Sequence, residues 1–367
     1  MSRWAWAEVS AAAIEHNVRE IARTVAPAQV WAVVKADGYG HGAAVAARAA
    51  LAGGAHGLCV ALVQEGVALR AAGVDGPILV LSEQPAMQTR AALDAQLQLT
   101  VYSREGVTAI ADAGGVGHPV HLKIDTGMRR VGAHANAAVA VAAEIEASPA
   151  TSLAGVFTHL AVADELDNPY TEHQLERFDD VLATLRAAGH HPPMVHAANS
   201  AGALAHQRAR YDMVRVGIAI YGISPGQGVD HLCAALRPAL SLHARVSHVK
   251  RVSAGERISY GLRHEFERDT TVATLPLGYA DGVPRRLHAV GGAVLLGGQP
   301  RPIVGVVTMD QLMVDCGDDP VAVGDEAVLL GRQGGHTITA ADWAERLDTI
   351  AYEIVCGISA RVERRLG

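Results

Sequence analysis

The sequence has few aromatic residues, few cysteines and no block of basic charge. Phenylalanine, tryptophan and tyrosine make up 4% of its 367 residues, whereas half of the residues are hydrophobic, so the core must be mainly aliphatic. The four cysteines lie far apart and form no C-x-x-C pair, which favours neither a zinc site nor a disulfide framework. Such cysteine usage is typical of a reducing compartment, the cytoplasm.

Charge and hydropathy exclude further classes. The net charge is −7 and no run of lysine or arginine stands out, so neither nucleic acid nor an anionic membrane surface is an expected partner. No apolar run is long enough to cross a membrane, and the first ten residues lack the apolar core of a signal peptide. The 18 histidines show no metal-ligand pattern, so no metal is expected. The length favours two domains.

The first part of the chain alternates short apolar runs with helical patterns. The eight runs that predict strands are 30–35, 57–62, 77–81, 97–102, 120–125, 154–159, 194–199 and 213–218. Near-continuous apolar strands are typical of parallel sheets covered by helices. A helix is expected after Ser10, with Ile14, Val18, Ile21 and Val25 on one stripe, and another over 170–189. Eight β-α units predict an α/β fold, a (β/α)8 TIM barrel over residues 9–232.

The second part has a different texture. Residues 238–249 alternate apolar and polar side chains, which predicts one period-two strand. Short β-like runs follow, separated by glycine pairs, and one helix is expected near 339–348. Residues 233–367 are therefore expected to form a mainly antiparallel β domain, against which residues 1–8 pack.

Polar residues gather where the predicted barrel strands end, and active sites of TIM barrels lie at that end. These residues are Lys35, Lys123, Asp125, His159, Asn199, Ser200 and Arg215. Lys35 alone would be read as a lysine that reaches water, but the convergence of several polar groups favours a site. Segments 198–202 and 215–222 follow the last two strands, where barrels often bind phosphate. Gly217 either allows close backbone approach to an anion or merely relieves crowding.

A lysine near a phosphate pocket is what a pyridoxal phosphate enzyme requires, since the amine forms a Schiff base with the aldehyde. The stretch "AVVKADGYGHG" resembles the cofactor-lysine motif of bacterial alanine racemases, which are fold-type III pyridoxal phosphate enzymes. The resemblance extends in order through "HLKIDTGMRRVG", "GVFTHLAVADE", "HAANSAG", "MVRVGIAIYG", "ISYG", "LPLGYADG" and "TMDQLMVD". It covers nearly the whole chain.

The resemblance implies roles for four catalytic residues. Lys35 would hold pyridoxal 5'-phosphate and act as the base toward D-alanine, while Tyr260, in "ISYG", would act on L-alanine from the opposite face. A racemase needs two such groups, because the proton leaves one face of a planar carbanion and arrives on the other. A phenol with a pKa near 10 needs neighbours that favour phenolate, and the resemblance supplies His159 and Arg215. Arg215 also matches the partner of the pyridine nitrogen.

Binding residues follow by the same resemblance. The implied cofactor contacts are Lys35, Tyr39, His159, Asn199, Ser200, Arg215, Gly217 and Ile218. Arg130 and the backbone amide of Met309 would meet the substrate carboxylate, although Arg130 could equally be a surface arginine. Lys123 matches a lysine that is carbamylated in many relatives; the alternative is an ammonium paired with Asp125. Tyr279 and Asp310 would line the path of the substrate, unless Tyr279 is only a turn residue.

The resemblance further implies a head-to-tail homodimer with shared active sites and a role in supplying D-alanine for peptidoglycan. One departure is Ala360, where some relatives have a phosphate-binding tyrosine. Three other functions remain open. They are a racemase of serine or of broader specificity, a non-catalytic pyridoxal phosphate carrier of the single-barrel type, and a metal-dependent barrel hydrolase using His159 and Asp125. The last has too few strand-end ligands.

Overall fold

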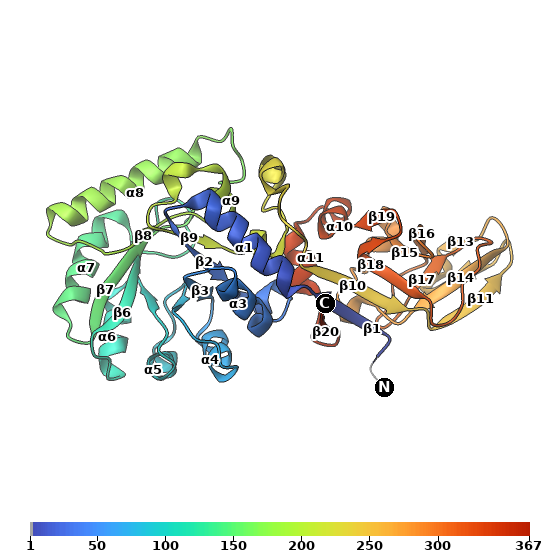
Figure 1. Ribbon diagram of the computed structural model, residues 1–367, viewed down its shortest axis with the longest axis horizontal. Helices are drawn as coiled ribbons and strands as arrows, with labels where there is room; N and C mark the ends of the chain where they lie inside the picture. The colour runs from blue at the N-terminus through green and yellow to red at the C-terminus, as the bar shows by residue number, and fades with distance from the viewer. Residues whose placement is uncertain (1–2) are drawn as a thin grey trace. The chain divides into compact units, whose positions relative to one another are not determined.

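The computed structural model describes residues 3–367, which form two compact units. One unit comprises Ala12–Tyr39 and Ala43–Arg237. The other comprises the N-terminal segment through Ala11, then Gly40–Gly42 and Pro238–Gly367. Figure 1 labels the helices and strands of both. None of the helices within residues 3–367 combines the length and the apolar character needed to cross a membrane.

The first unit is a parallel β-barrel, as predicted. Its eight strands are β2 (Gln29–Val33), β3 (Gly57–Val60), β4 (Ile78–Val80), β5 (Leu99–Val101), β6 (His118–Lys123), β7 (Thr151–Phe157), β8 (Val195–His196) and β9 (Met213–Val216). They are ordered β4-β3-β2-β9-β8-β7-β6-β5. A parallel bridge between Leu79 and Gln98 joins the two ends of this order and closes the barrel. All eight predicted strands are therefore confirmed.

Helices cover the outside of the barrel strands (Figure 1). They are α1 (Ala11–Val25), α3 (Ala43–Ala52), α4 (Val63–Ala71), α5 (Ala86–Asp94), α6 (Arg104–Asp112), α7 (Ala138–Ala147), α8 (Tyr170–Ala187) and α9 (Ser200–Ala205). The predicted stripe of α1 is buried, because Ile14, Val18, Ile21 and Val25 are each at most 1% exposed. Strands covered in this way are buried on both faces, which explains their near-continuous apolar sequences.

The second unit is mainly antiparallel. Its strands are β1 (Ala5–Val9), β10 (Leu240–Arg245), β11 (His248–Val252), β12 (Arg257–Ile258), β13 (His264–Glu265), β14 (Thr270–Leu275), β15 (Ala293–Leu296), β16 (Gln299–Val304), β17 (Leu312–Asp315), β18 (Glu326–Gln333), β19 (His336–Ile338) and β20 (Glu363–Leu366). The N-terminal strand β1 pairs antiparallel with β10 and parallel with β20. The chain therefore begins in this sheet before it enters the barrel.

Two expectations about this unit need correction. Residues 238–249 do not form one strand, since β10 pairs with β1 and β18 whereas β11 pairs with β14. The alternation runs on through Val246 and Ser247 while the chain changes partners. The expected helix is α10 (Ala340–Leu347), but a second short helix, α11 (Ala351–Gly357), follows it. Asp348, with a φ of 57°, ends α10 and lets the chain turn into α11.

Candidate active site

Lys35 lies at the carboxyl end of β2, at the start of a left-handed turn. The turn, α2 (Lys35–Tyr39), has φ values of 51°, 52° and 63° at Ala36, Asp37 and Gly38. Such values are costly for residues with a Cβ, so the surroundings must hold them. The amide of Ala36 donates to the Glu65 carboxylate at 2.7 Å, and Asp37 accepts from the amide of Ala43 at 2.8 Å. Lys35 is half-buried and lies at the start of a turn that hydrogen bonds to Glu65 and Ala43 hold in place.

The ends of β8 and β9 form a compact backbone cradle, again from residues that the sequence predicts. Asn199 caps α9 by accepting from the amide of Gly202 at 2.9 Å. The Ser200 hydroxyl accepts from the amide of Gly217 at 3.0 Å, so its own proton can be donated elsewhere. A Cβ at Gly217 would lie 2.4 Å from the Tyr39 hydroxyl. The buried Ile218 begins a short 3-10 turn directly after this glycine. Backbone and hydroxyl donors therefore gather beside Tyr39.

Arg215, on β9, is the charged group at the centre of the barrel. It is 3% exposed and donates to the carbonyls of Thr158 and Ala197 at 2.8 and 2.9 Å. A further contact, at 3.4 Å, joins it to Nδ1 of His159. Burial lowers the pKa of Arg215 to about 10, so the guanidinium remains protonated at neutral pH. Its position agrees with the predicted role as a fixed hydrogen-bond donor.

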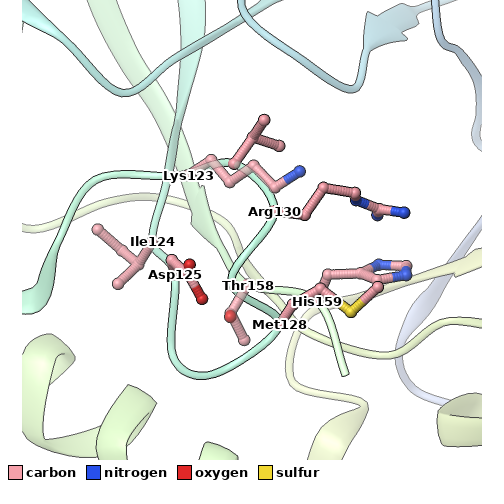
Figure 2. Close-up of a pocket in the computed structure, with 8 residues that line it drawn as sticks. Lys123, Ile124, Asp125, Met128, Arg130, Thr158 and His159 are labelled. Carbon is pink, nitrogen blue, oxygen red and sulfur yellow. The ribbon is translucent and has the colours of Figure 1, made fainter. Parts of the chain in front are cut away.

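Three of the predicted site residues, Lys123, Arg130 and His159, line one narrow pocket at the strand ends. Figure 2 shows Lys123, Arg130 and His159 extending toward the same side of this pocket. The pKa of His159 is held well below its usual value, first by burial and then by Arg215, Arg130, Lys123 and Lys35. His159 is therefore neutral at pH 7 and lies near two arginines, Arg215 and Arg130, and two lysines, Lys123 and Lys35. Such a site favours ligands with several negative charges.

The surroundings of Lys123 bear on both interpretations of this residue. Asp125 accepts from the backbone amides of Gly127 and Arg129 at 2.9 and 3.0 Å, and among residues 3–367 no ion pair joins it to Lys123. The Lys123 amine instead lies 3.4 Å from the carbonyl of Leu81. Burial, followed by nearby cations, lowers the pKa of Lys123 to about 7. A large share of this amine is therefore uncharged near neutral pH.

The remaining predicted site residues lie in the second unit, on adjoining loops. Tyr260 is 71% exposed and Met309 is 52% exposed. The amide of Tyr279 donates to the carbonyl of Thr308 at 2.9 Å, which ties the loop of Tyr279 to that of Met309. Asp310 is paired with Arg361 at 2.7 Å. Ala360 is exposed and supplies no hydroxyl.

The sequence interpretation missed a group of polar side chains inside the barrel, His121 and His196 above all. Both are at most 1% exposed and lie 2.9 Å apart. A signal was present, because His121 precedes Lys123 by two residues on one strand and therefore shares its face. No group of three histidine, cysteine, aspartate or glutamate side chains within the described part of the chain could hold a metal ion.

The donor set fits pyridoxal 5'-phosphate in three respects. Lys35 provides an amine at a strand end, and the cradle at Ser200 and Gly217 has the small residues and donors that a phosphate needs. Arg215 provides a permanent donor deep in the barrel. A parallel barrel with these groups at the carboxyl ends of its strands defines a barrel-type pyridoxal phosphate enzyme.

Comparison with known proteins defines the family. The model of the alanine racemase N-terminal domain matches residues 9–225, and that of the alanine racemase C-terminal domain matches residues 239–366. Alanine racemase from Symbiobacterium thermophilum is 49% identical over 99% of this chain and 97% of its own. Alanine racemase from Thermobifida fusca is 47% identical over 99% and 98%.

Solved structures agree. The crystal structure of alanine racemase from Bacillus anthracis with bound L-Ala-P has a TM-score of 0.95 and 39% identity, covering 100% of this chain and 96% of that one. The structure of alanine racemase from E. faecalis has a TM-score of 0.94 and 38% identity over 100% and 98%. This chain belongs to the alanine racemase family, whose members are pyridoxal phosphate-dependent isomerases. The match to both domains contradicts the single-barrel carrier alternative.

Proposed function

We propose that this chain interconverts L-alanine and D-alanine with pyridoxal 5'-phosphate and supplies D-alanine for peptidoglycan. The observation that carries the proposal is the cationic strand-end site. Lys35, Lys123, Arg130 and Arg215 all act on the pKa of the one histidine, His159. This arrangement suits an anionic cofactor together with an anionic substrate. The family of the chain supplies the reaction.

When bound, the cofactor draws electrons from the substrate carbon, so that its hydrogen can leave as a proton. In the proposed mechanism the Lys35 amine holds the cofactor and exchanges a proton with one face of that carbon. The Tyr260 phenol exchanges a proton with the other face. Nδ1 of the neutral His159 lies 3.4 Å from Nη2 of Arg215, whose two protons go to two backbone carbonyls. With Nδ1 facing this cation, the ring proton is placed on Nε2 and can be donated toward the phenol oxygen. Arg215 keeps its own proton throughout.

The phosphate and carboxylate groups are assigned to separate donors. Tyr39, Asn199, Ser200, Gly217 and Ile218 are proposed to hold the phosphate; this is supported by the close packing of Tyr39 against Gly217. Arg130 and the amide of Met309 are proposed to bind the substrate carboxylate. Arg130 is exposed, but it lines the pocket with Lys123 and His159, which supports its role at this site. Tyr279 and Asp310 are proposed to line the path of the substrate.

We also propose that the active form is a head-to-tail homodimer with shared sites. Tyr260, Leu262 and Met309 are 71%, 55% and 52% exposed, and large apolar groups exposed together are typical of a surface that another chain covers. The proposed domain division is 9–232 and 233–367, with residues 1–8 in the second domain. The pairing of β1 with β10 supports it. A cytoplasmic location is supported by Cys59, Cys233 and Cys316, which form no disulfide.

Borohydride trapping followed by chiral product analysis tests the function. The chain has only three lysines, Lys35, Lys123 and Lys250, so a reduced cofactor adduct can be mapped to one peptide. We expect a yellow protein whose adduct lies on Lys35, is absent from Lys35→Ala and persists in the control Lys250→Ala, since Lys250 is exposed on β11. L-Alanine should yield D-alanine. Faster racemisation of L-serine would favour the broader-specificity alternative, and an adduct on another lysine would refute the assignment.

A further inference from the structure

A chain of four polar side chains crosses the interior of the barrel. Nη1 of Arg215 lies 2.6 Å from Nδ1 of His196, and Nε2 of His196 lies 2.9 Å from Nδ1 of His121. Nε2 of His121 in turn lies 2.9 Å from Oε1 of Gln98. These residues come from β9, β8 and β6 and from the position directly before β5. Side chains from four parts of the barrel wall thus form one connected line across its interior.

The direction of every hydrogen bond in this line follows from Arg215. A guanidinium has five N–H donors and no acceptor, so Nδ1 of His196 must accept. A neutral His196 then carries its proton on Nε2 and donates to Nδ1 of His121. By the same reasoning His121 carries its proton on Nε2 and donates to the Gln98 carbonyl oxygen. Each histidine therefore has one allowed tautomer.

The surroundings keep both histidines neutral and fix their planes. His196 is fully buried and stacks on Phe157, with ring centres 4.6 Å apart and planes at 6°. His121 meets the edge of Trp31 at 6.5 Å. Burial is the largest cause that lowers the pKa of both histidines, to about 3 for His121 and well below the usual value for His196, and Arg215 lowers both further. A second proton on either ring would place a donor against a donor.

The bond to His196 adds a third acceptor to the two carbonyls that already bind the guanidinium of Arg215. Nη2 of Arg215 donates to the carbonyls of Thr158 and Ala197, and Nη1 donates to His196. Rotation of the planar group would break all three contacts at once. The remaining N–H groups of Arg215 therefore have a fixed direction.

We propose that His196, His121 and Gln98 are positioning residues that hold the Arg215 guanidinium in one rotational state through a line of hydrogen bonds with one fixed direction. This inference rests on the proposed role of Arg215 as a donor to the cofactor. None of the three residues is placed in contact with substrate or cofactor. They act through Arg215: a change in any of them would alter the direction in which the Arg215 N–H groups point.

The tautomers test the proposal without any change in sequence. Nitrogen-15 spectra of the histidine-labelled holoenzyme should show His121 and His196 with a proton on Nε2 and none on Nδ1, unchanged from pH 6 to 9. The Nη protons of Arg215 should give separate, slowly exchanging signals, because the group cannot rotate. A proton on Nδ1 of His196 or His121, or averaged Nη signals, would overturn the proposal whether or not the enzyme racemises alanine. Failure of the proposed function would instead appear as no adduct on Lys35.

Paired variants test the link to activity. His196→Asn keeps an oxygen near the place of Nδ1 and should retain slow Nη signals and a kcat within about threefold of wild type. His196→Leu removes the acceptor and should average the Nη signals and lower kcat roughly ten- to hundredfold, as expected for a lost hydrogen bond to a charged group, with KM little changed.

His118→Leu is the control, because His118 also lies on β6 but its side chain bonds to the carbonyl of Leu97, at 2.7 Å, and is not part of the line. It should leave kcat and the Nη signals unchanged. Equal losses in the two His196 variants with unchanged Nη signals would refute positioning through Arg215.

Discussion

The hydroxyl of Tyr39 occupies the space that any side chain at position 217 would need. A Cβ at Gly217 would lie 2.4 Å from that oxygen and 3.0 Å from the ring carbon that carries it. Gly217→Ala must therefore push Tyr39 out of the proposed phosphate cradle. Because overpacking costs about 1–3 kcal/mol, we expect cofactor affinity to fall roughly ten- to hundredfold. Fluorescence titration of the apoprotein with pyridoxal 5'-phosphate measures the change.

Two further variants make this test specific. Gly335→Ala is the control, because a Cβ at Gly335 meets nothing within 4 Å and should leave cofactor affinity unchanged. Tyr39→Phe alone measures the affinity lost with the hydroxyl. In that background Gly217→Ala should cost less further affinity than it does in wild type, because the clashing oxygen is gone. If Gly217→Ala binds cofactor as well as wild type, Gly217 only relieves crowding in the barrel.

The depressed pKa of Lys123 predicts a pH-dependent stability. Burial, with help from Arg215 and Arg130, lowers this pKa from its usual 10.5 to about 7. Between these pH values the unfolded chain binds a proton at Lys123 that the folded chain does not. The free energy of unfolding should therefore rise with pH across this window, by up to about 1.4 kcal/mol per pH unit from this residue.

Urea unfolding in CO2-free buffer at pH 7, 8 and 9 tests this slope. Lys123→Met keeps the apolar stem but has no titrating amine, so its stability should rise less steeply with pH than that of wild type. Lys250→Met, changed at an exposed lysine on β11, should follow wild type. If the free energy of unfolding rises equally steeply with pH for wild type and Lys123→Met, the pKa of Lys123 is not lowered in the folded protein.

An uncharged amine at Lys123 is also able to attack dissolved CO2, which predicts carbamylation. In carbon-13 bicarbonate at pH 8, wild type should show one carbamate signal by NMR that Lys123→Arg lacks. Lys250→Arg should keep the signal. We expect Lys123→Arg to raise KM for alanine, since Lys123 lines the same pocket as Arg130, the proposed partner of the substrate carboxylate. No carbamate signal in wild type would favour an ordinary amine at this position.

The barrel could be predicted because each of its strands is covered by helices and therefore has its own apolar run. Such a run can be recognised in the sequence without knowing which strands lie beside it. The strand-end residues could also be predicted, because carboxyl ends of parallel strands meet at one rim. Lys123, Arg130 and His159 come together for this reason. The sequence was sufficient to predict a strand or a site residue wherever the residue's own apolar run, or its place at a strand end, determined where it lies.

Partners that depend on the curvature of the sheet could not be predicted. His121 and His196 are separated by 75 positions and meet only because the barrel turns β6 and β8 toward a common centre. The break between β10 and β11 could not be predicted for another reason: the alternation of side chains continues while the strand partners change. The left-handed turn after Lys35 depends on Glu65, which lies about 30 positions further on, in the first turn of α4.

Shared active sites predict complementation between two inactive chains. Lys35→Ala and Tyr260→Phe should each abolish most activity alone, because each removes one of the two proposed bases. After unfolding and refolding together, half of the dimers are mixed and each mixed dimer has one intact site, so roughly a quarter of wild-type activity should return. Two chains that both carry Lys35→Ala and Tyr260→Phe give the baseline. No recovery after exchange is verified by mass spectrometry would rule out shared sites.

The salt bridge between Arg3 and Asp281 predicts that the N-terminal segment stabilises the loop that carries Tyr279. Asp281 is fully buried and takes two contacts from Arg3, at 2.5 and 2.8 Å, and one from the amide of Gly278 at 2.9 Å. Burial acts to raise the pKa of Asp281, but the hydrogen bonds from Arg3 and Gly278 outweigh it and hold the pKa below its usual value.

Arg3→Ala should therefore lower the free energy of unfolding by about 1–3 kcal/mol at pH 7, because it leaves a buried carboxylate short of donors. Arg251→Ala, which removes an exposed pair with Asp318, should cost only about 0–1 kcal/mol. Asp281 stabilises the fold above its unfolded pKa, near 4, and this contribution is lost as the pH falls through the lower folded value. Urea unfolding of wild type and Arg3→Ala should thus differ at pH 7 and converge toward pH 3. An equal difference at both pH values would show that Arg3 acts through packing and not through the Asp281 charge.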